Sequence, residues 1–279
     1  MIIDKNLPKI SIVTPSFNSA KYIEDCIQSV LNQNYPNFEH IIIDGSSTDG
    51  TIRILKKYPH LKWISEPDEG QSDAINKGFK MANGEIIGWL NADEFYLKDA
   101  FKKVVNFSIQ NPYAEILYGD SIYTDAESKF VRYRASHPFN YGILLYYGPF
   151  IQTCSLFLKK ELILGEYILD VKFNYVMDHE YLVRLAKAQK KFSYIPEPLG
   201  VFRWVGDNKS LNYSDPNRIN ETLWVRQMYG RYISHSLIST KIFYCFFRTL
   251  RIITLLKYSI FQKESKMKKI FQNKLLIWF

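Results

Sequence analysis

Apolar residues in the first hundred positions alternate between two patterns. Short continuous apolar runs, typical of strands buried on both faces, occupy residues 10–14, 39–44, 61–65 and 85–90. Apolar residues at helical spacing occupy the segments between them, at 20–32, 49–58 and 71–81. Strands separated by single helices predict right-handed crossovers and a mostly parallel sheet in an α/β fold.

The alternation becomes less regular after residue 99. We expect helices to Gln110 and over 178–188, and strands near 116–118, 130–133, 153–158, 192–195 and 199–204. This pattern predicts a second half built onto the first sheet. Residues 206–216, rich in Asn, Ser and Asp, mark a boundary before a helical carboxyl-terminal region. The chain therefore divides into 1–98, 99–205 and 206–279.

Polar side chains gather where the four predicted strands end. They lie at 14–18, 44–51, 66–73 and 91–94. Ligands of parallel α/β sheets bind beyond the carboxyl ends of the strands, so these segments predict one cleft rich in carboxylates. Each segment alone is also typical of an ordinary loop with a helix cap. Their coincidence at matching strand ends favours a binding site.

The charge is concentrated at one end of the chain. The sequence has 36 Lys and Arg against 28 Asp and Glu, a net charge of +8. Nine basic residues and one acidic residue lie from Lys241 onward, so the residues before it carry 27 of each. A neutral body argues against nucleic acid as the main ligand.

Cys26, Cys154 and Cys245 lie far apart, which argues against a zinc site or disulfide framework and fits a reducing compartment. With no basic and apolar leader at residues 1–5, we expect a cytoplasmic protein.

Four motifs together resemble the family 2 inverting glycosyltransferases. They are residues 11–18, 44–51, 70–78 and 89–94, with weaker similarity over 177–185. The resemblance implies the A-type glycosyltransferase fold, with a Rossmann-like, mostly parallel sheet and a helical carboxyl-terminal extension. It also implies a nucleotide-sugar-binding half at 1–98 and an acceptor-binding half at 99–205 of the same catalytic domain.

The resemblance assigns a metal and a donor site. A carboxylate-bound divalent cation stabilises a departing diphosphate, and oxygen ligands suit Mn²⁺ or Mg²⁺. By resemblance, Asp93 is the metal ligand, whereas Asn91 replaces an Asp of many relatives with a neutral amide. The implied nucleotide-sugar-binding residues are Thr14, Pro15, Phe17, Asn18, Asp44, Ser46, Gln71, Ser72, Asp73, Asn91, Ala92 and Arg203, with Lys209 as a further candidate for the diphosphate.

The identity of the base stays open at this point. Gly45 stands where the family often has a second Asp that contacts the base, so Asp44 or Asp73 is the expected substitute. Either carboxylate can accept the imide N–H of uracil or thymine, and equally the N–H groups of guanine. Phe17 is expected either to stack on the base or to belong to the core.

Inversion needs a general base close to the acceptor hydroxyl. Asp178, at the start of a predicted helix, matches the catalytic carboxylate of the family. The alternative is a helix cap, a position that is expected to lower its pKa. His179 and Glu180 are further candidates, although Arg184 lies four residues after Glu180 and is expected to pair with it.

The predicted activity is metal-dependent, inverting transfer of a sugar from a nucleotide-diphosphate donor, a UDP-sugar, to an acceptor hydroxyl. The resemblance places this reaction in cell-surface polysaccharide or lipopolysaccharide assembly, with a glycan or lipid-linked glycan as acceptor. One alternative is a polyprenyl-phosphate sugar transferase. Another is a non-catalytic nucleotide-sugar binder, suggested by Asn91, Gly45 and by Val205, which replaces a frequent His of the family.

The carboxyl-terminal region 241–279 is both apolar and basic. Its uncharged runs, 242–247 and 252–256, are too short to span a bilayer. As a helix, it is predicted to carry one polar stripe of Lys241, Tyr244, Arg248, Arg251, Ser259, Gln262 and Lys266. We expect it to attach the protein to the anionic inner face of the cell membrane, with 263–269 at the lipid head groups. The alternative is packing against the catalytic body or a second copy.

Overall fold

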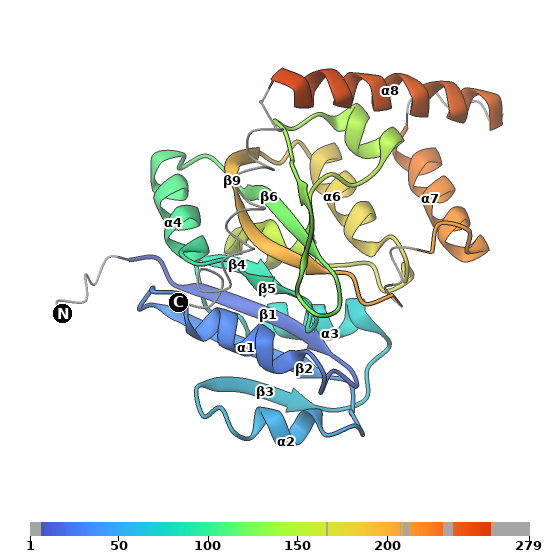
Figure 1. The fold of residues 1–279 in the computed structure, drawn as a ribbon. Coiled ribbons are helices and arrows are strands. Elements are labelled where there is room, and N and C mark those ends of the chain that lie inside the picture. The colour runs from blue at the N-terminus through green and yellow to red at the C-terminus, as the bar shows by residue number, and fades with distance from the viewer. Residues whose placement is uncertain (1–6, 166, 207, 209–211, 231–236, 258–279) are drawn as a thin grey trace.

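In the part of the chain that the computed structural model describes, the fold is a nine-stranded sheet with flanking helices (Figure 1). The described residues are 7–165, 167–206, 208, 212–230 and 237–257. The strands are β1 (Ile10–Ser16), β2 (Phe38–Asp44), β3 (Leu61–Ser65), β4 (Ile86–Trp89), β5 (Phe95–Tyr96), β6 (Ile116–Thr124), β7 (Phe130–Arg134), β8 (Leu156–Lys159) and β9 (Phe192–Arg203). The helices are α1 (Ile23–Leu31), α2 (Thr51–Leu55), α3 (Gln71–Met81), α4 (Ala100–Gln110), η1 (Ile143–Tyr147), η2 (Thr153–Ser155), α5 (Lys160–Ile163), α6 (Met177–Lys187), α7 (Pro216–Tyr229) and α8 (Leu237–Lys257).

The first half contains the predicted parallel strands. The order along the sheet is β3-β2-β1-β4-β8-β6-β9-β5, and β1 to β4 run parallel to their neighbours in this half. All three isoleucines at 41–43 are 0% exposed, as expected for a strand covered on both faces. The register places Ser16 beside Asp44, and Asp44 beside Ser65. The polar strand ends therefore meet at one edge of the sheet.

The second half continues the same sheet through an antiparallel strand. β8 pairs antiparallel with β4 and β6, and β6 pairs parallel with β9. The two strands predicted at 192–195 and 199–204 are one strand, β9, whose register against β6 shifts around Pro196 and Pro198. Because proline has no N–H to donate to the ladder, the irregularity falls there. One apolar core joins Val13 and Trp89 of the first half to Tyr181 and Val225 of α6 and α7.

Helix α8 lies over the second half (Figure 1), and aromatic rings make the contact. Phe247 stacks on Tyr146 of η1 at 5.2 Å, and Tyr244 stacks on Tyr147 at 5.6 Å between ring centroids. Arg251 is 7% exposed and donates from Nη2 to the Ala135 carbonyl oxygen at 3.2 Å. Two members of the predicted polar stripe, Tyr244 and Arg251, thus face the body of the protein, as the alternative of packing against the body predicts for this helix.

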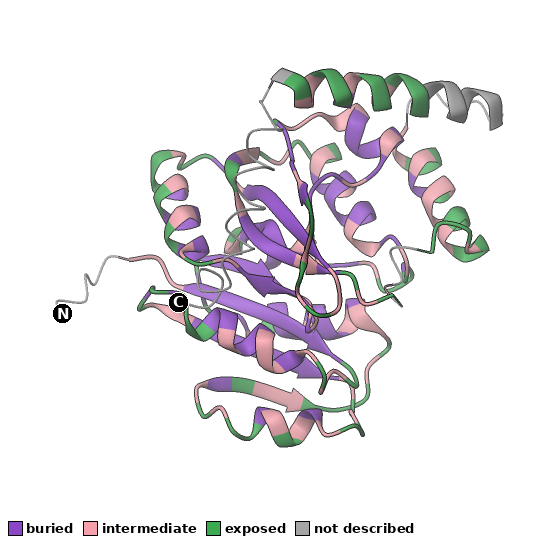
Figure 2. Ribbon diagram, in the orientation of Figure 1, coloured by how far each residue is buried: buried purple, intermediate pink, exposed green. Residues whose placement is uncertain are grey.

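The opposite side of α8 is exposed and largely apolar (Figure 2). Phe246 and Leu256 are each 61% exposed, and Ile252 and Ile253 are each 48% exposed. Among the described residues, no helix is long and apolar enough to cross a membrane. Residues 258–279, which include the predicted head-group segment 263–269, lie outside the described residues, as do the side chains of Lys241 and Lys257.

Candidate active site

The loops after β1 and β2 are tied to each other by Asn18. Its backbone N–H donates to Ser47 Oγ at 2.7 Å, and its Oδ1 accepts from the Thr48 N–H at 2.9 Å. Asn18 and Ser46 both have left-handed backbones, with φ of 48° and 62°, and Ser46 is exposed. Phe17 is 66% exposed at this edge, so the alternative that it belongs to the core was wrong.

Asp44 lies beneath these loops and organises them. Its side chain is 0% exposed, and Oδ2 accepts from the Ser47 N–H at 2.9 Å and from Ser65 Oγ at 2.7 Å. Asp73, the other expected base contact, lies 3.2 Å from Lys77 Nζ and accepts the Glu69 N–H. Both carboxylates are therefore engaged by the protein itself.

Several other predicted donor-site residues lie below the strand ends. Thr14 is 0% exposed, with Oγ1 2.9 Å from His40 Nε2, and Pro15 and Ala92 are also buried. Ser72, 4% exposed, has its Oγ 3.0 Å from Met177 Sδ of α6. These buried side chains pack below the candidate site. Ser72 contacts α6 and so links the first half of the chain to the second.

The neutral side chain of Asn91 has partners on both of its polar atoms. Oδ1 accepts from Gln71 Nε2 at 2.8 Å and from Trp89 Nε1 at 3.0 Å, and Nδ2 donates to Thr153 Oγ1 at 3.4 Å. A carboxylate has no hydrogen to donate to Thr153. The asparagine thus connects the ends of β4 and α3 to η2 without adding a charge.

Asp93 and Glu94 form an acidic pair at the end of β4. Burial raises the pKa of Asp93, although the nearby Arg203 opposes the rise. The Asn208 amide donates to Asp93 Oδ2 at 3.2 Å. Glu94 is 1% exposed and accepts from the Asn91 N–H at 3.1 Å. Burial, the charge of Asp93 and, to a smaller extent, that of Asp178 raise the pKa of Glu94 to about 8.

Arg203 is 3% exposed, and its charge lowers the pKa of Asp93 against the effect of burial. Its Nη2 is 2.6 Å from Asp25 Oδ2, and the guanidinium lies over the rings of Tyr22 and Phe95. Because the guanidinium is buried and paired with Asp25, its effect on the site is electrostatic: it favours the charged form of Asp93. Lys209, the other basic candidate, lies outside the described residues.

Asp178 lies in the first turn of α6, whose cap residue is Val176. Burial raises the pKa of Asp178 against the opposing hydrogen bond from the His179 N–H at 2.8 Å. The expectation that a cap position would lower this pKa was therefore wrong, because loss of solvent outweighs the helix-end contribution.

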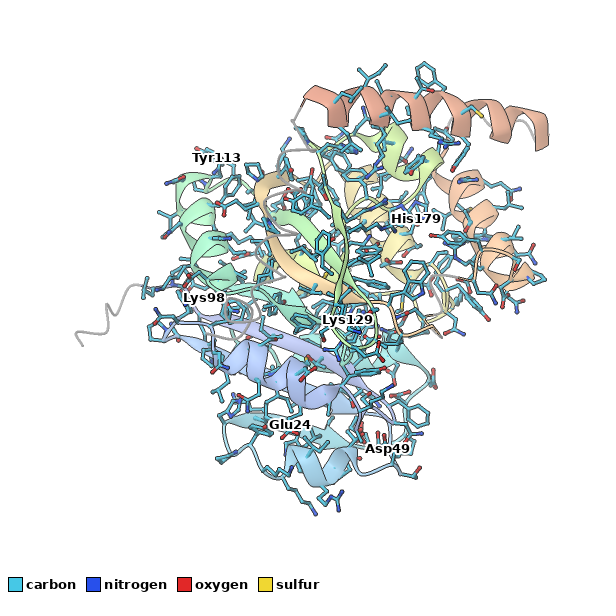
Figure 3. The ribbon with its side chains drawn as sticks, viewed as in Figure 1. Glu24, Asp49, Lys98, Tyr113, Lys129 and His179 are labelled. Carbon is cyan, nitrogen blue, oxygen red and sulfur yellow. The ribbon has the colours of Figure 1, made fainter. Side chains whose placement is uncertain are left out.

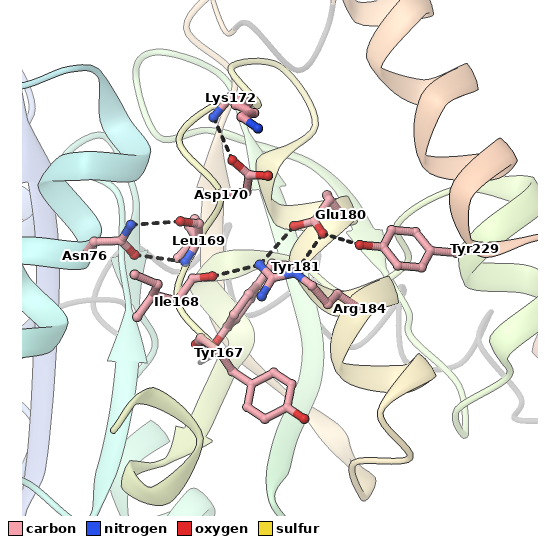
Figure 4. Close-up of polar contacts among 10 residues, drawn as sticks. All are labelled: Asn76, Tyr167, Ile168, Leu169, Asp170, Lys172, Glu180, Tyr181, Arg184 and Tyr229. Atoms are coloured by element: carbon pink, nitrogen blue, oxygen red, sulfur yellow. Dashed lines mark hydrogen bonds and ion pairs between the residues drawn. The ribbon is translucent and has the colours of Figure 1, made fainter. Parts of the chain in front are cut away.

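The two alternatives to Asp178 are engaged elsewhere. His179 is 1% exposed, with Nε2 2.7 Å from the Leu144 carbonyl oxygen, and burial lowers its pKa to about 4 (Figure 3). Glu180 accepts from Arg184 Nε at 2.8 Å and from Tyr229 OH at 2.8 Å (Figure 4). The predicted pairing of Glu180 with Arg184 is confirmed.

Asn76 and Glu221, which are not among the predicted site residues, hold the segment that leads to Asp178. Asn76 of α3 pairs with the backbone of Leu169 (Figure 4), and Glu221 of α7 accepts the backbone N–H groups of residues 174–176 at 2.8–3.0 Å. Asn76 lies within the motif at 70–78, so the sequence contained a signal that could have identified it. Glu221 lies outside every motif.

The acidic end of β4 has the chemistry that a divalent cation requires. Among the described residues, no three His, Cys, Asp or Glu side chains cluster as a metal site. Mg²⁺ and similar cations are often held by one or two carboxylates, with substrate phosphates and water as the other ligands. Burial raises the pKa values of Asp93 and Glu94, and the charge of Asp93 adds to the rise for Glu94, so a nearby cation would favour the charged carboxylates. Asp93 therefore has the chemistry that a ligand of such a cation requires.

The fold is similar to solved sugar transferases. TarS 1–349 from S. aureus in complex with UDP-GlcNAc superimposes with a TM-score of 0.63 at 17% identity, covering 86% of this chain and 71% of that one. The mannosyltransferase PcManGT from Pyrobaculum calidifontis, in complex with GDP-Man and Mn²⁺, gives 0.59 at 17% identity over 82% and 66%. The chain thus has the α/β fold of the A-type glycosyltransferases.

Sequence comparison gives the same classification. The chain is 36% identical over 121 residues to the putative teichuronic acid biosynthesis glycosyltransferase TuaG of Bacillus subtilis, which is 41% of this chain and 48% of that protein. The match therefore spans about half the length of this relative. Residues 11–162 match the family model described as glycosyl transferase family 2. This chain belongs to glycosyl transferase family 2.

Proposed function

We propose that this glycosyltransferase is metal-dependent and inverting, and that it moves a sugar from a UDP-sugar to an acceptor hydroxyl. The observation that carries the proposal is that the start of α3 links the end of β4 to the start of α6. Gln71 donates to Asn91 at 2.8 Å, and Ser72 Oγ lies 3.0 Å from Met177 Sδ. The charge of Asp178, next to Met177, contributes with burial and Asp93 to the raised pKa of Glu94. Carboxylates with perturbed pKa values at the strand ends of such a sheet are the groups expected at an active site.

In this proposal Asp178 is the general base. Its carboxylate takes the proton of the acceptor hydroxyl as that oxygen bonds to the anomeric carbon, and the bond from this carbon to the diphosphate oxygen breaks on the opposite side. A raised pKa brings a carboxylate closer to the working pH, where a general base is most effective. Asp93 would hold Mn²⁺ or Mg²⁺, which when bound stabilises the charge on the departing diphosphate.

The donor and acceptor classes have support from relatives. The UDP-GlcNAc complex of TarS supports a UDP-sugar, and the Mn²⁺ in the PcManGT complex supports a divalent cation. The name of TuaG refers to teichuronic acid biosynthesis, which supports a glycan or lipid-linked glycan acceptor in cell-surface polysaccharide or lipopolysaccharide assembly.

The proposal includes a peripheral location on the inner face of the cell membrane. The exposed apolar face of α8 and the basic residues that follow it support this location. A helix with such a face lies in the plane of the interface, where basic residues meet anionic head groups.

The experiment that tests the activity is a panel of nucleotide sugars with Mn²⁺, Mg²⁺ or EDTA, measuring release of the nucleoside diphosphate. We expect metal-dependent release from a UDP-sugar and inversion at the anomeric carbon by NMR. An arm with polyprenyl phosphate as acceptor separates hydroxyl from phosphate transfer. Tight donor binding with no turnover under any condition would instead support the non-catalytic binder.

A further inference from the structure

Gly45 leaves space that the side chain of Asp68 occupies. A Cβ added to Gly45 would lie 2.6 Å from Asp68 Oδ2 and 3.3 Å from its Cγ. The Asp68 carboxylate, from the loop between β3 and α3, therefore rests directly over Gly45. An acid side chain at position 45, frequent in the family, could not coexist with Asp68 in this position.

The same point is bordered by an exposed aromatic ring. The added Cβ of Gly45 would lie 3.5 Å from Cδ2 of Phe17, which is 66% exposed after β1. Large apolar side chains exposed at a strand-end cleft are suited to stacking against a planar ligand. At the edge where β1, β2 and β3 end, Gly45 thus lies next to one exposed aromatic ring, Phe17, and one carboxylate, Asp68. Figure 1 shows where these strands end.

The two oxygens of Asp68 differ in their surroundings. Oδ1 accepts the backbone N–H of Gly70 at 2.9 Å, which orients the carboxylate. Oδ2 is the atom that lies over Gly45. By contrast, the carboxylate of Asp44 is 0% exposed and accepts hydrogen bonds from serines, and that of Asp73 pairs with Lys77.

We infer that Asp68 is the residue that reads the nucleobase of the donor, with Oδ2 accepting the single imide N–H of uracil beside the Phe17 ring. This inference rests on the proposed function, because it names the base-reading residue of that donor site. Guanine presents two adjacent N–H donors that pair best with both oxygens of one carboxylate, and the Gly70 N–H already takes one of the two acceptor positions on Oδ1. Cytosine presents an acceptor in place of the imide N–H, so it would face Oδ2 with repulsion.

The test measures binding of UDP, N3-methyl-UDP, GDP and CDP to the full chain by calorimetry with Mn²⁺ present. We expect the wild type to prefer UDP over the other three. Asp68→Ala should weaken UDP binding about 10- to 100-fold, the range for a hydrogen bond to a charged group. Asp68→Asn should weaken it less, because its amide oxygen can still accept the imide N–H. They should bind N3-methyl-UDP nearly as the wild type does, because that ligand has no imide N–H to lose. Glu69→Gln, which removes an exposed neighbouring charge, is the matched control and should bind UDP normally.

Two variants at position 45 test the spatial relation itself. Gly45→Ala should displace the Asp68 carboxylate and weaken UDP binding without lowering the melting temperature, since only a side-chain end must move. Gly45→Asp combined with Asp68→Ala should recover UDP affinity lost in Asp68→Ala, because it returns a carboxylate to the same place.

If the wild type binds UDP and the Asp68 variants bind it equally well, the inference is overturned while the proposed function stands. A wild type that binds no nucleoside diphosphate would overturn both.

Discussion

The side-chain amide of Asn76 pairs in both directions with the backbone of Leu169. Nδ2 donates to the Leu169 carbonyl oxygen at 2.9 Å, and Oδ1 accepts the Leu169 N–H at 2.9 Å (Figure 4). Asn76 belongs to α3 of the first half, and Leu169 begins the segment that ends at Asp178. This pair therefore fixes the distance between the donor half and the proposed base.

We expect Asn76→Ala to lower both stability and turnover. It leaves a buried N–H and carbonyl of Leu169 without partners, at a cost of about 1–3 kcal/mol, which is a melting shift of a few degrees in a chain of this size. Turnover should fall more than UDP affinity, because the displaced group is Asp178. Asn83→Ala, at an exposed position, is the control and should change neither quantity. Loss of UDP affinity with unchanged turnover would contradict this role.

Asp93→Ala should abolish transfer and weaken UDP binding in the presence of Mn²⁺. Asp93 is the carboxylate of the 91–94 motif that matches the metal ligand of the family, whereas Glu94 is turned toward the Asn91 N–H and Thr153. The measurement is UDP affinity with Mn²⁺ and with EDTA, where the variant should have lost the difference between the two. Near-normal turnover in Asp93→Ala together with inactivity of Glu94→Ala would show that the metal assignment is wrong.

Asp178→Asn should reduce turnover by about two to four orders of magnitude, the usual contribution of a general base. UDP affinity should change little, because Asp178 acts on the acceptor side. The raised pKa adds a second readout: wild-type turnover should decline as acidity protonates Asp178, at a pH above the ordinary range of an aspartate. Asp170→Asn, an acid of the preceding segment, is the control. A large melting shift in Asp178→Asn with unchanged kinetics would make the residue structural.

Glu94 is expected to make the metal-free protein less stable as the pH rises from about 5 to about 8. Its pKa is about 8 in the folded protein against 4.5 for a free side chain, so the folded state holds the proton more tightly. Between these two values the free energy of unfolding therefore falls as the pH rises. In EDTA, the melting temperature of Glu94→Gln should decline less from pH 5 to pH 8 than that of the wild type. Glu69→Gln should follow the wild type, and equal slopes for all three proteins would contradict the raised pKa.

Local patterns predicted the elements of the first half and not the contacts between distant segments. The isoleucines at 41–43 identify a buried strand because a continuous apolar run is itself the signal. The Asn76–Leu169 pair joins residues 93 positions apart, and no periodicity encodes it. The rise in the pKa of Asp178 also depends on contacts between distant segments, because those contacts bury the start of the helix. In α8, apolar residues occur on several sides, so the inward face is set by contacts with the body, such as the stacking of Phe247 on Tyr146 and the burial of Arg251.

The outward face of α8 gives the last prediction, which concerns membrane attachment. We expect the full chain to sediment with vesicles that contain anionic lipid, and the triple substitution Phe246→Ser, Ile253→Ser and Leu256→Ser to weaken this binding by at least about tenfold. These side chains are 48–61% exposed, so their replacement removes apolar contact with lipid, at about 25 cal/mol per Å², without opening the core. This design is preferable to deleting α8, because deletion would expose Tyr146 and the surface beneath Phe247.

A matched control separates membrane insertion from general surface hydrophobicity. Ile109→Ser, Val131→Ser and Leu164→Ser replace three apolar residues that are 44–71% exposed on other elements, and they should leave vesicle binding unchanged. Raising the salt concentration should weaken binding of the wild type, because the basic residues after Lys241 contribute by charge. The α8 substitutions should matter at both low and high salt, since contact of apolar side chains with lipid is not screened. If the full chain ignores anionic vesicles at low salt, or if the α8 and control substitutions act alike, α8 is not the membrane-binding surface.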